Sequence, residues 1–157
     1  MTAPAEVGVL VDASAGWQSA RAAALDAVGS GAASIWVADV GAPVPTLAAL
    51  AMEVSLAGLG LLVDPRRRPL TVLGKQLSSL DVVAGGRLRT AIDATGDPDG
   101  AEEAVVVLRG LLAGGPLTHS GPRATAEGAR ALPPSPQGDR VEMWLLGPPE
   151  VAGRAWG

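Results

Sequence analysis

The fold is decided by Pro69–Asp93, PLTVLGKQLSSLDVVAGGRLRTAID. Its leucines recur at intervals of four and three residues, as on one face of a helix: Leu73, Leu77 and Leu80. The pair Gly85-Gly86 predicts the end of this helix, because glycine accepts the left-handed conformation of a C-terminal cap. The short apolar run Leu88–Asp93 then predicts a strand. Helix, glycine turn and strand in this order make half of a βαβ unit.

The same alternation extends to both sides of this stretch. Apolar runs predict further strands at 6–13, 33–39, 59–63 and 141–146. Periodic apolar positions and end signals predict further helices at 17–28, from Pro45 onward, and from Asp97 to Gly114-Gly115. Segment 118–140 breaks the rhythm and is predicted to be irregular or a hairpin, and a fifth helix is expected to begin within 150–156. Strict alternation favours parallel strands joined by right-handed crossovers.

Composition limits the classes of function. The 157 residues are enough for one domain, and their net charge of −4 argues against nucleic-acid and anionic-membrane partners. The chain has no cysteine, which excludes disulfides and thiolate chemistry. No secretory signal opens the sequence, so we expect a cytoplasmic protein. The apolar stretch 45–63 is interrupted by Glu53 and two glycines, which argues against a membrane span.

The pattern P-x-x-x-x-x-KQ-x-x-x-LD-x-x-x-GGRL, which begins at Pro69, resembles the signature of the luciferase-like monooxygenases. These are TIM-barrel enzymes that use a flavin or a deazaflavin. The runs SIWVAD, LAGLGLLVDPRRRP and MWLLGPPEVAGRA resemble the second, third and fifth strands of that family with their adjoining turns. The resemblance covers nearly the whole chain and the N-terminal part of the barrel. It therefore implies an α/β fold: a partial, truncated TIM barrel in which about five parallel strands alternate with helices, as one domain over residues 1–157.

The resemblance also implies FMN or a deazaflavin as cofactor, but the sequence departs from the family at positions near that site. Asp39 ends a predicted strand and is followed by Val40 and Gly41, where the family usually has a polar residue or histidine. Gly60-Leu61 stands where the family often has Gly-Thr, and strands six to eight, with their phosphate-binding loops, have no counterpart. Two hypotheses follow: an oxidoreductase or monooxygenase that acts through an oligomer, or a diverged member without a redox cofactor that serves as a binding or partner subunit.

Candidate cofactor-binding residues are Asp39, Arg66 and Arg67, because each follows a predicted strand on the side where barrels bind ligands. The alternatives are a helix-capping or loop acid for Asp39 and a solvated charge run for the arginines. No residue is assigned a catalytic role and no metal is expected, since His119 is the only histidine.

Four further predictions concern structure and partners. Asp81 and Arg87 are expected to pair at a helix end. Trp36 and Trp144 are expected to lie in the core. Five parallel strands leave two open edges, so we expect a homo-oligomer or a complex with a full-length relative. A small-molecule ligand is also expected.

Overall fold

The computed structural model describes residues 6–148 and contains one five-stranded sheet. All the strands are parallel, and their order across the sheet follows the sequence: β1 (Gly8–Val11), β2 (Ser34–Ala38), β3 (Gly58–Val63), β4 (Leu88–Asp93) and β7 (Glu142–Leu146). Helices connect them: α1 (Trp17–Gly29), α2 (Pro43–Glu53), α3 (Leu70–Val83) and α4 (Pro98–Leu112). The predicted α/β fold of about five parallel strands alternating with helices is confirmed.

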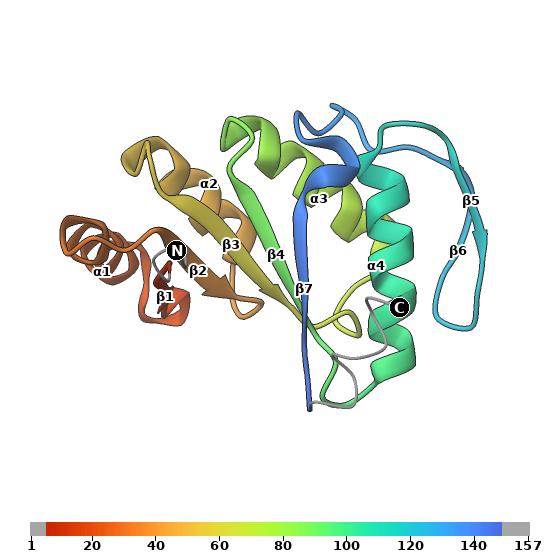
Figure 1. Ribbon diagram of the computed structural model, residues 1–157, viewed down its shortest axis with the longest axis horizontal. Helices are drawn as coiled ribbons and strands as arrows, with labels where there is room; N and C mark the ends of the chain where they lie inside the picture. Colours follow the sequence, from red (N-terminus) through yellow and green to blue (C-terminus); the bar gives the residue numbers. More distant parts are fainter. Residues whose placement is uncertain (1–5, 149–157) are drawn as a thin grey trace, which may run out of the picture.

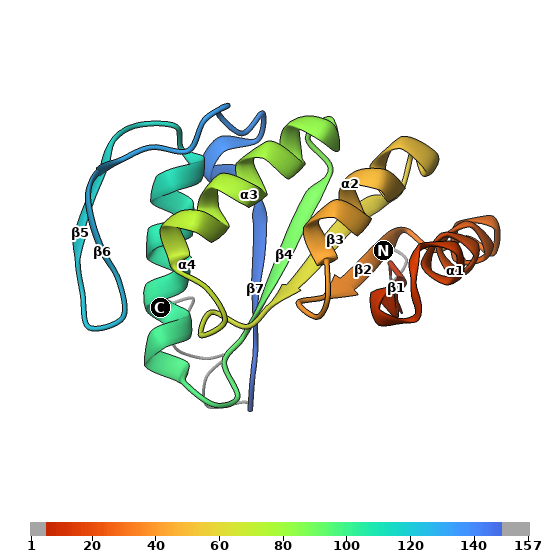
Figure 2. The ribbon, with the colours of Figure 1, turned by 180° about the vertical axis from the view of Figure 1, so that it is seen from behind.

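The helices lie along one side of the curved sheet, and consecutive helices pack against each other (Figures 1 and 2). The strand side chains that point toward them are almost wholly buried, as in Ile35, Leu61 and Ile92. Together with the apolar stripes of the helices they form the core. Among residues 6–148, no helix covers the opposite face of the sheet, which we call the inner face.

Element ends differ from the predicted bounds for local reasons. Helix α2 begins at Pro43 rather than Pro45, since a proline is tolerated anywhere in the first turn, where its missing N–H has no partner to lose. Strand β1 stops at Val11 because the Asp12 side chain accepts a hydrogen bond from the Ser14 amide and starts a short 3-10 turn, Ala13–Ala15. Helix α3 ends as predicted, before two glycines with φ of 63° and 77°.

Segment 118–140 contains a hairpin, one of the two predicted alternatives. Its strands are β5 (Leu117–Ser120) and β6 (Thr125–Ala129), which pair antiparallel. The hairpin lies beyond α4, on the side of that helix away from the sheet (Figures 1 and 2). A second 3-10 turn, Gly138–Arg140, leads into β7. The predicted fifth helix lies outside the described residues.

The predicted pairing of Asp81 with Arg87 is wrong. The buried Asp81 carboxylate accepts hydrogen bonds from the Ser135 hydroxyl and the Gln137 side chain, so it fixes the loop before β7. The Arg87 guanidinium instead lies under the end of α2, where helix carbonyls have no helical partner. It donates to four backbone carbonyls: Ala51, Val54, Ala57 and Ala84.

Within residues 6–148, no helix combines the length and the hydropathy that a bilayer crossing requires. The apolar stretch 45–63 divides between α2 and β3, as its glutamate and glycines indicated.

We predict that Arg87→Ala destabilises the protein by about 2–3 kcal/mol, because it leaves several half-buried carbonyls without a donor. Urea unfolding measures the change in the free energy of unfolding. Arg130→Ala is the matched control, since Arg130 is exposed and its loss is expected to cost less than about 0.5 kcal/mol. Equal free energies of unfolding for the two variants would contradict the stabilisation of the end of α2 by Arg87.

Candidate functional site

The carboxyl ends of the strands meet at one edge of the sheet, and an aspartate stands at or directly after the end of β1, β2, β3 and β4. These residues are Asp12, Asp39, Asp64 and Asp93. Open parallel α/β sheets and barrels bind ligands at this edge. Of these four aspartates, only Asp39 was predicted to be a site residue. The repeat was visible as an acid closing each of four apolar runs.

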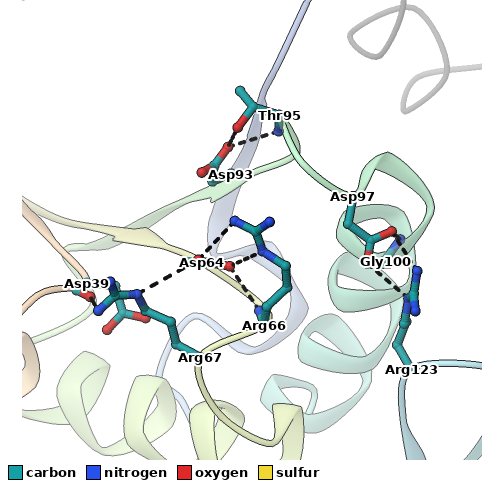
Figure 3. A network of polar contacts seen from close by, with 9 residues as sticks. All are labelled: Asp39, Asp64, Arg66, Arg67, Asp93, Thr95, Asp97, Gly100 and Arg123. Carbon is teal, nitrogen blue, oxygen red and sulfur yellow. Dashed lines mark hydrogen bonds and ion pairs between the residues drawn. The ribbon is translucent and has the colours of Figure 1, made fainter.

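The loop after β3 folds back over this edge and brings the predicted residues Asp39, Arg66 and Arg67 together (Figure 3). Arg66 donates to the Asp64 carboxylate from Nε at 2.8 Å and from Nη2 at 3.1 Å. Arg67 donates from Nη1 to the backbone carbonyl of Asp39 at 2.8 Å. Arg68, the third arginine of the run, forms an ion pair with the Asp39 carboxylate.

The Asp39 side chain is only 3% exposed, although it is a carboxylate. Its Oδ1 binds Arg68, whereas Oδ2 is buried and has no hydrogen-bond partner among the described residues. It is not the cap of the next helix, because the N-cap of α2 is Ala42. A buried carboxylate oxygen without a donor is costly, so Oδ2 is a candidate acceptor for a ligand N–H or O–H group.

Ion pairing fixes the charge states at this edge. The hydrogen bond from Arg66 holds the pKa of Asp64 below its ordinary value, and burial opposes this only in part. The same contact raises the pKa of Arg66. At neutral pH both groups are therefore charged. The carboxylate holds one side of the guanidinium in a fixed position.

A second ion pair stands across from the first. Asp97 caps α4 by accepting the Gly100 amide at 3.1 Å, and Arg123 from the hairpin binds its carboxylate at 2.9 Å. The Gly100 amide, helped by Arg123, lowers the pKa of Asp97. A cavity of about 690 Å³ lies between this pair and Arg66. Arg123 could not be predicted from the sequence, since it lies in the tip of a hairpin with no periodic pattern.

The inner face of the sheet carries a pair of stacked indoles. The ring centroids of Trp36 and Trp144 are 5.2 Å apart and the rings are inclined by 28°. Gly60 lies beneath Trp36, and a Cβ at that position would overlap the indole. Trp36 is buried as predicted. Trp144 is 40% exposed, so the prediction that it lies in the core is wrong. The reason is that no described element covers this face.

Beside the indoles, the inner face forms a cavity of about 520 Å³. Its apolar walls include Leu10, Leu62 and Leu146. At the amino end of the strands, Arg89 makes ion pairs with Glu6 at 3.0 Å and Glu142 at 3.3 Å. The inner face is thus apolar toward its carboxyl edge and charged at its amino edge.

Comparison with solved structures identifies proteins with this fold. The coenzyme F420-dependent tetrahydromethanopterin reductase from Methanopyrus kandleri matches 90% of this chain with a TM-score of 0.79 and 19% identity. The long-chain alkane monooxygenase LadA matches 97% with a TM-score of 0.78 and 13% identity. The oxygenating constituent of 3,6-diketocamphane monooxygenase from Pseudomonas putida, in complex with FMN, matches 89% with a TM-score of 0.71 and 16% identity.

The fold is that of the luciferase-like monooxygenases. The resemblance stated from the sequence is confirmed at this level. The chain spans about half the length of the matched structures: 50% of the reductase, 54% of LadA and 51% of the diketocamphane enzyme. No protein-family model matches the sequence, and no curated protein matches it.

His119 lies away from the inner face, on the hairpin, and its Nε2 is 2.9 Å from the Glu103 carboxylate on α4. That carboxylate also accepts the backbone amides of Arg123 and Ala124 at 3.0 and 2.9 Å. Burial tends to raise the pKa of Glu103, but the bonds from His119 and the two amides together lower it. Glu103 thus fixes the hairpin tip that carries Arg123.

We predict that Glu103→Gln loosens the hairpin while the sheet stays folded, because an amide is a weaker acceptor for these three donors. Faster hydrogen exchange at the amides of Arg123 and Ala124 checks this. Acid should act in the same way: a lowered pKa gives stability that is lost as pH falls below the ordinary value of 4.5. Unchanged protection factors for these two amides, which correct the exchange rate for its intrinsic dependence on pH, in the variant and at pH 3 would contradict this role of Glu103.

Proposed function

We propose that this chain forms one wall of a luciferase-like oxidoreductase that binds FMN or a deazaflavin. The observation that carries the proposal is the inner face, where an apolar cavity beside Trp36 and Trp144 shares Leu62 with a smaller cavity at the carboxyl edge that is lined by Arg67. A planar apolar ring with an anionic tail matches that pair of surfaces. The matched structures include an F420-dependent reductase and a monooxygenase in complex with FMN, which supports the choice of ligand.

The residues present fit such a ligand. A cavity of about 520 Å³ lies within the usual range of about 300–1,000 Å³ for small-molecule sites. Leu62 and Ala91 line the cavity with apolar side chains, and Trp144 provides an exposed indole for stacking. The unpartnered Oδ2 of Asp39 can accept a ligand hydrogen bond, and Arg66 and Arg67 can donate to its tail. A bound flavin or deazaflavin supplies hydride transfer, and the chain supplies orientation and exclusion of water.

We further propose that a second copy of the chain completes the site. Leu10 on β1 and Leu146 on β7 are 59% and 42% exposed, and both lie on the inner face at the two edges of the sheet. A two-fold axis parallel to the strands would bring each β7 beside the β1 of the other copy. Every strand would stay parallel and both inner faces would be covered. Such pairing removes the exposed edges that promote aggregation.

A second candidate function is a binding subunit without redox chemistry. The observation that favours it is the position of Trp36, which fills the space above Gly60 on the inner face. The residues Val40 and Gly41 also provide no side chain that could exchange a proton near the cofactor. A measurement of flavin binding distinguishes the two functions, because only the oxidoreductase requires a flavin or deazaflavin.

We predict that riboflavin binds the purified protein with a dissociation constant in the micromolar range and quenches tryptophan fluorescence, because its ring would stack near Trp144. The variant Trp144→Leu should weaken binding about 10-fold, a stacking contribution of about 1.5 kcal/mol. The variant Trp17→Leu is the control, since Trp17 lies on α1 and is similarly exposed at 38%. The same affinity in both variants, or no binding by the wild type, would count against the ring site.

We also predict that sedimentation velocity at micromolar concentration shows a dimer. A charge at Leu10, introduced as Leu10→Glu, should shift the protein to monomer, because that side chain would lie in the covered face. Met52→Glu is the control at a residue that is 79% exposed on α2. A wild-type monomer at these concentrations would overturn the proposed second copy and leave the fold assignment intact.

A further inference from the structure

We infer that the cavity between the first turns of α3 and α4 binds the phosphate group of a small ligand. The cavity of about 690 Å³ is lined by arginines from two distant segments, Arg66–Arg68 and Arg123. It lies beside the carboxyl edge rather than on the inner face. The inference adds a phosphate site to the proposed function. It rests on that function only in the choice of flavins as probes.

The arginines are held in place by carboxylates yet still face the solvent. Asp64 binds Nε and Nη2 of Arg66, and Asp97 binds the same two nitrogens of Arg123. The side chains of Arg66 and Arg123 are nevertheless 52% and 57% exposed. Each guanidinium is therefore held through Nε and Nη2, while more than half of the side chain stays open to a ligand. Guanidinium groups fixed in this way lose little entropy when they bind an anion.

Stability does not account for this cluster of charges. Exposed ion pairs contribute about 0–1 kcal/mol each, so pairs at this degree of exposure add little to folding. The pairs do determine where the guanidiniums lie. The positive charge of Arg66 also acts on Asp97, since it contributes to the lowered pKa of that carboxyl group. Arg66, Asp97 and Arg123 line the same cavity, and Figure 3 shows the two ion pairs to which they belong.

The backbone around the cavity permits close approach. Gly96 lies directly against the Arg66 guanidinium, and a Cβ added there would collide with Nη1. At the other side, α3 begins after Pro69 with no side-chain cap and no acid in its first turn. The first amides of that helix lack helical partners, and its dipole favours an anion. A phosphate, with a double charge and three free oxygens, can accept from several such donors at once.

The test measures inorganic phosphate binding by the change in melting temperature, at constant ionic strength maintained with chloride. We expect saturable stabilisation of the wild type, and at least a 10-fold weaker apparent affinity in the double variant Arg66→Gln/Arg123→Gln. Arg21→Gln is the control, since Arg21 is also ion-paired, with Glu53, but lies on α1. No stabilisation of the wild type, or equal stabilisation of all three proteins, would overturn the inference.

A second variant protects the test against misfolding of the first. Gly96→Ala should displace the Arg66 guanidinium and weaken phosphate binding several-fold while every arginine is retained. Gly115→Ala is its control, because a Cβ at that position meets nothing within 4 Å. If both glycine variants fold and bind phosphate as the wild type does, Arg66 is not part of the site.

Comparison of three probes distinguishes the sources of the phosphate. Tighter binding of FMN than of riboflavin, with the difference lost in Arg66→Gln/Arg123→Gln, assigns the cavity to the cofactor tail. Phosphate binding with equal affinities for FMN and riboflavin assigns it to a phosphorylated substrate. Phosphate binding without any flavin binding supports the cavity and overturns the proposed flavin function. Riboflavin binding without phosphate binding supports the proposed flavin function and overturns the inference about the cavity.

Discussion

A parallel sheet that is wound in one direction places all its crossover helices on the same side, and this constraint governs the rest of the structure. Each βαβ crossover adds its strand next to the previous one, and the strand order follows the sequence. Four consecutive crossovers then place helices α1 to α4 over one face (Figures 1 and 2). The same geometry leaves the inner face without a covering layer among residues 6–148. The exposed side chains of Leu10, Trp144 and Leu146 are the direct consequence.

The carboxyl edge follows from the same constraint. Because every strand points the same way, the acids that end β1 to β4 gather at one edge. Like charges this close together need cations, and the loop after β3 provides three arginines that bind Asp39 and Asp64. The acids thereby become the supports on which guanidinium groups are oriented. An arginine held in this way is a better anion receptor than a mobile one, since its conformational entropy has already been lost.

Periodicity and end signals sufficed to predict the alternating elements, because each strand and helix is specified by residues close together in the sequence. The glycines after α3 show this, since their φ values require a residue without a Cβ. Contacts between distant segments could not be predicted in the same way. Arg87 was assigned a local partner, whereas it reaches the end of α2 more than thirty residues away. Asp39, Arg66 and Arg67 could be placed at one edge of the sheet because strand polarity alone brings their segments together, and their role in binding a cofactor stays a prediction.

The contacts that sequence reasoning missed share one property: they join residues that are far apart in the sequence or on different elements. Arg123 reaches Asp97 only because Glu103 accepts the backbone amides at the hairpin tip and holds it against α4. Trp144 stacks on Trp36 only because Gly60 lies between their strands and lets one indole lie flat across the sheet. The two candidate sites therefore depend on residues, Glu103 and Gly60, that position other side chains. A ligand with a flat ring and an anionic tail is the kind of molecule that would require both.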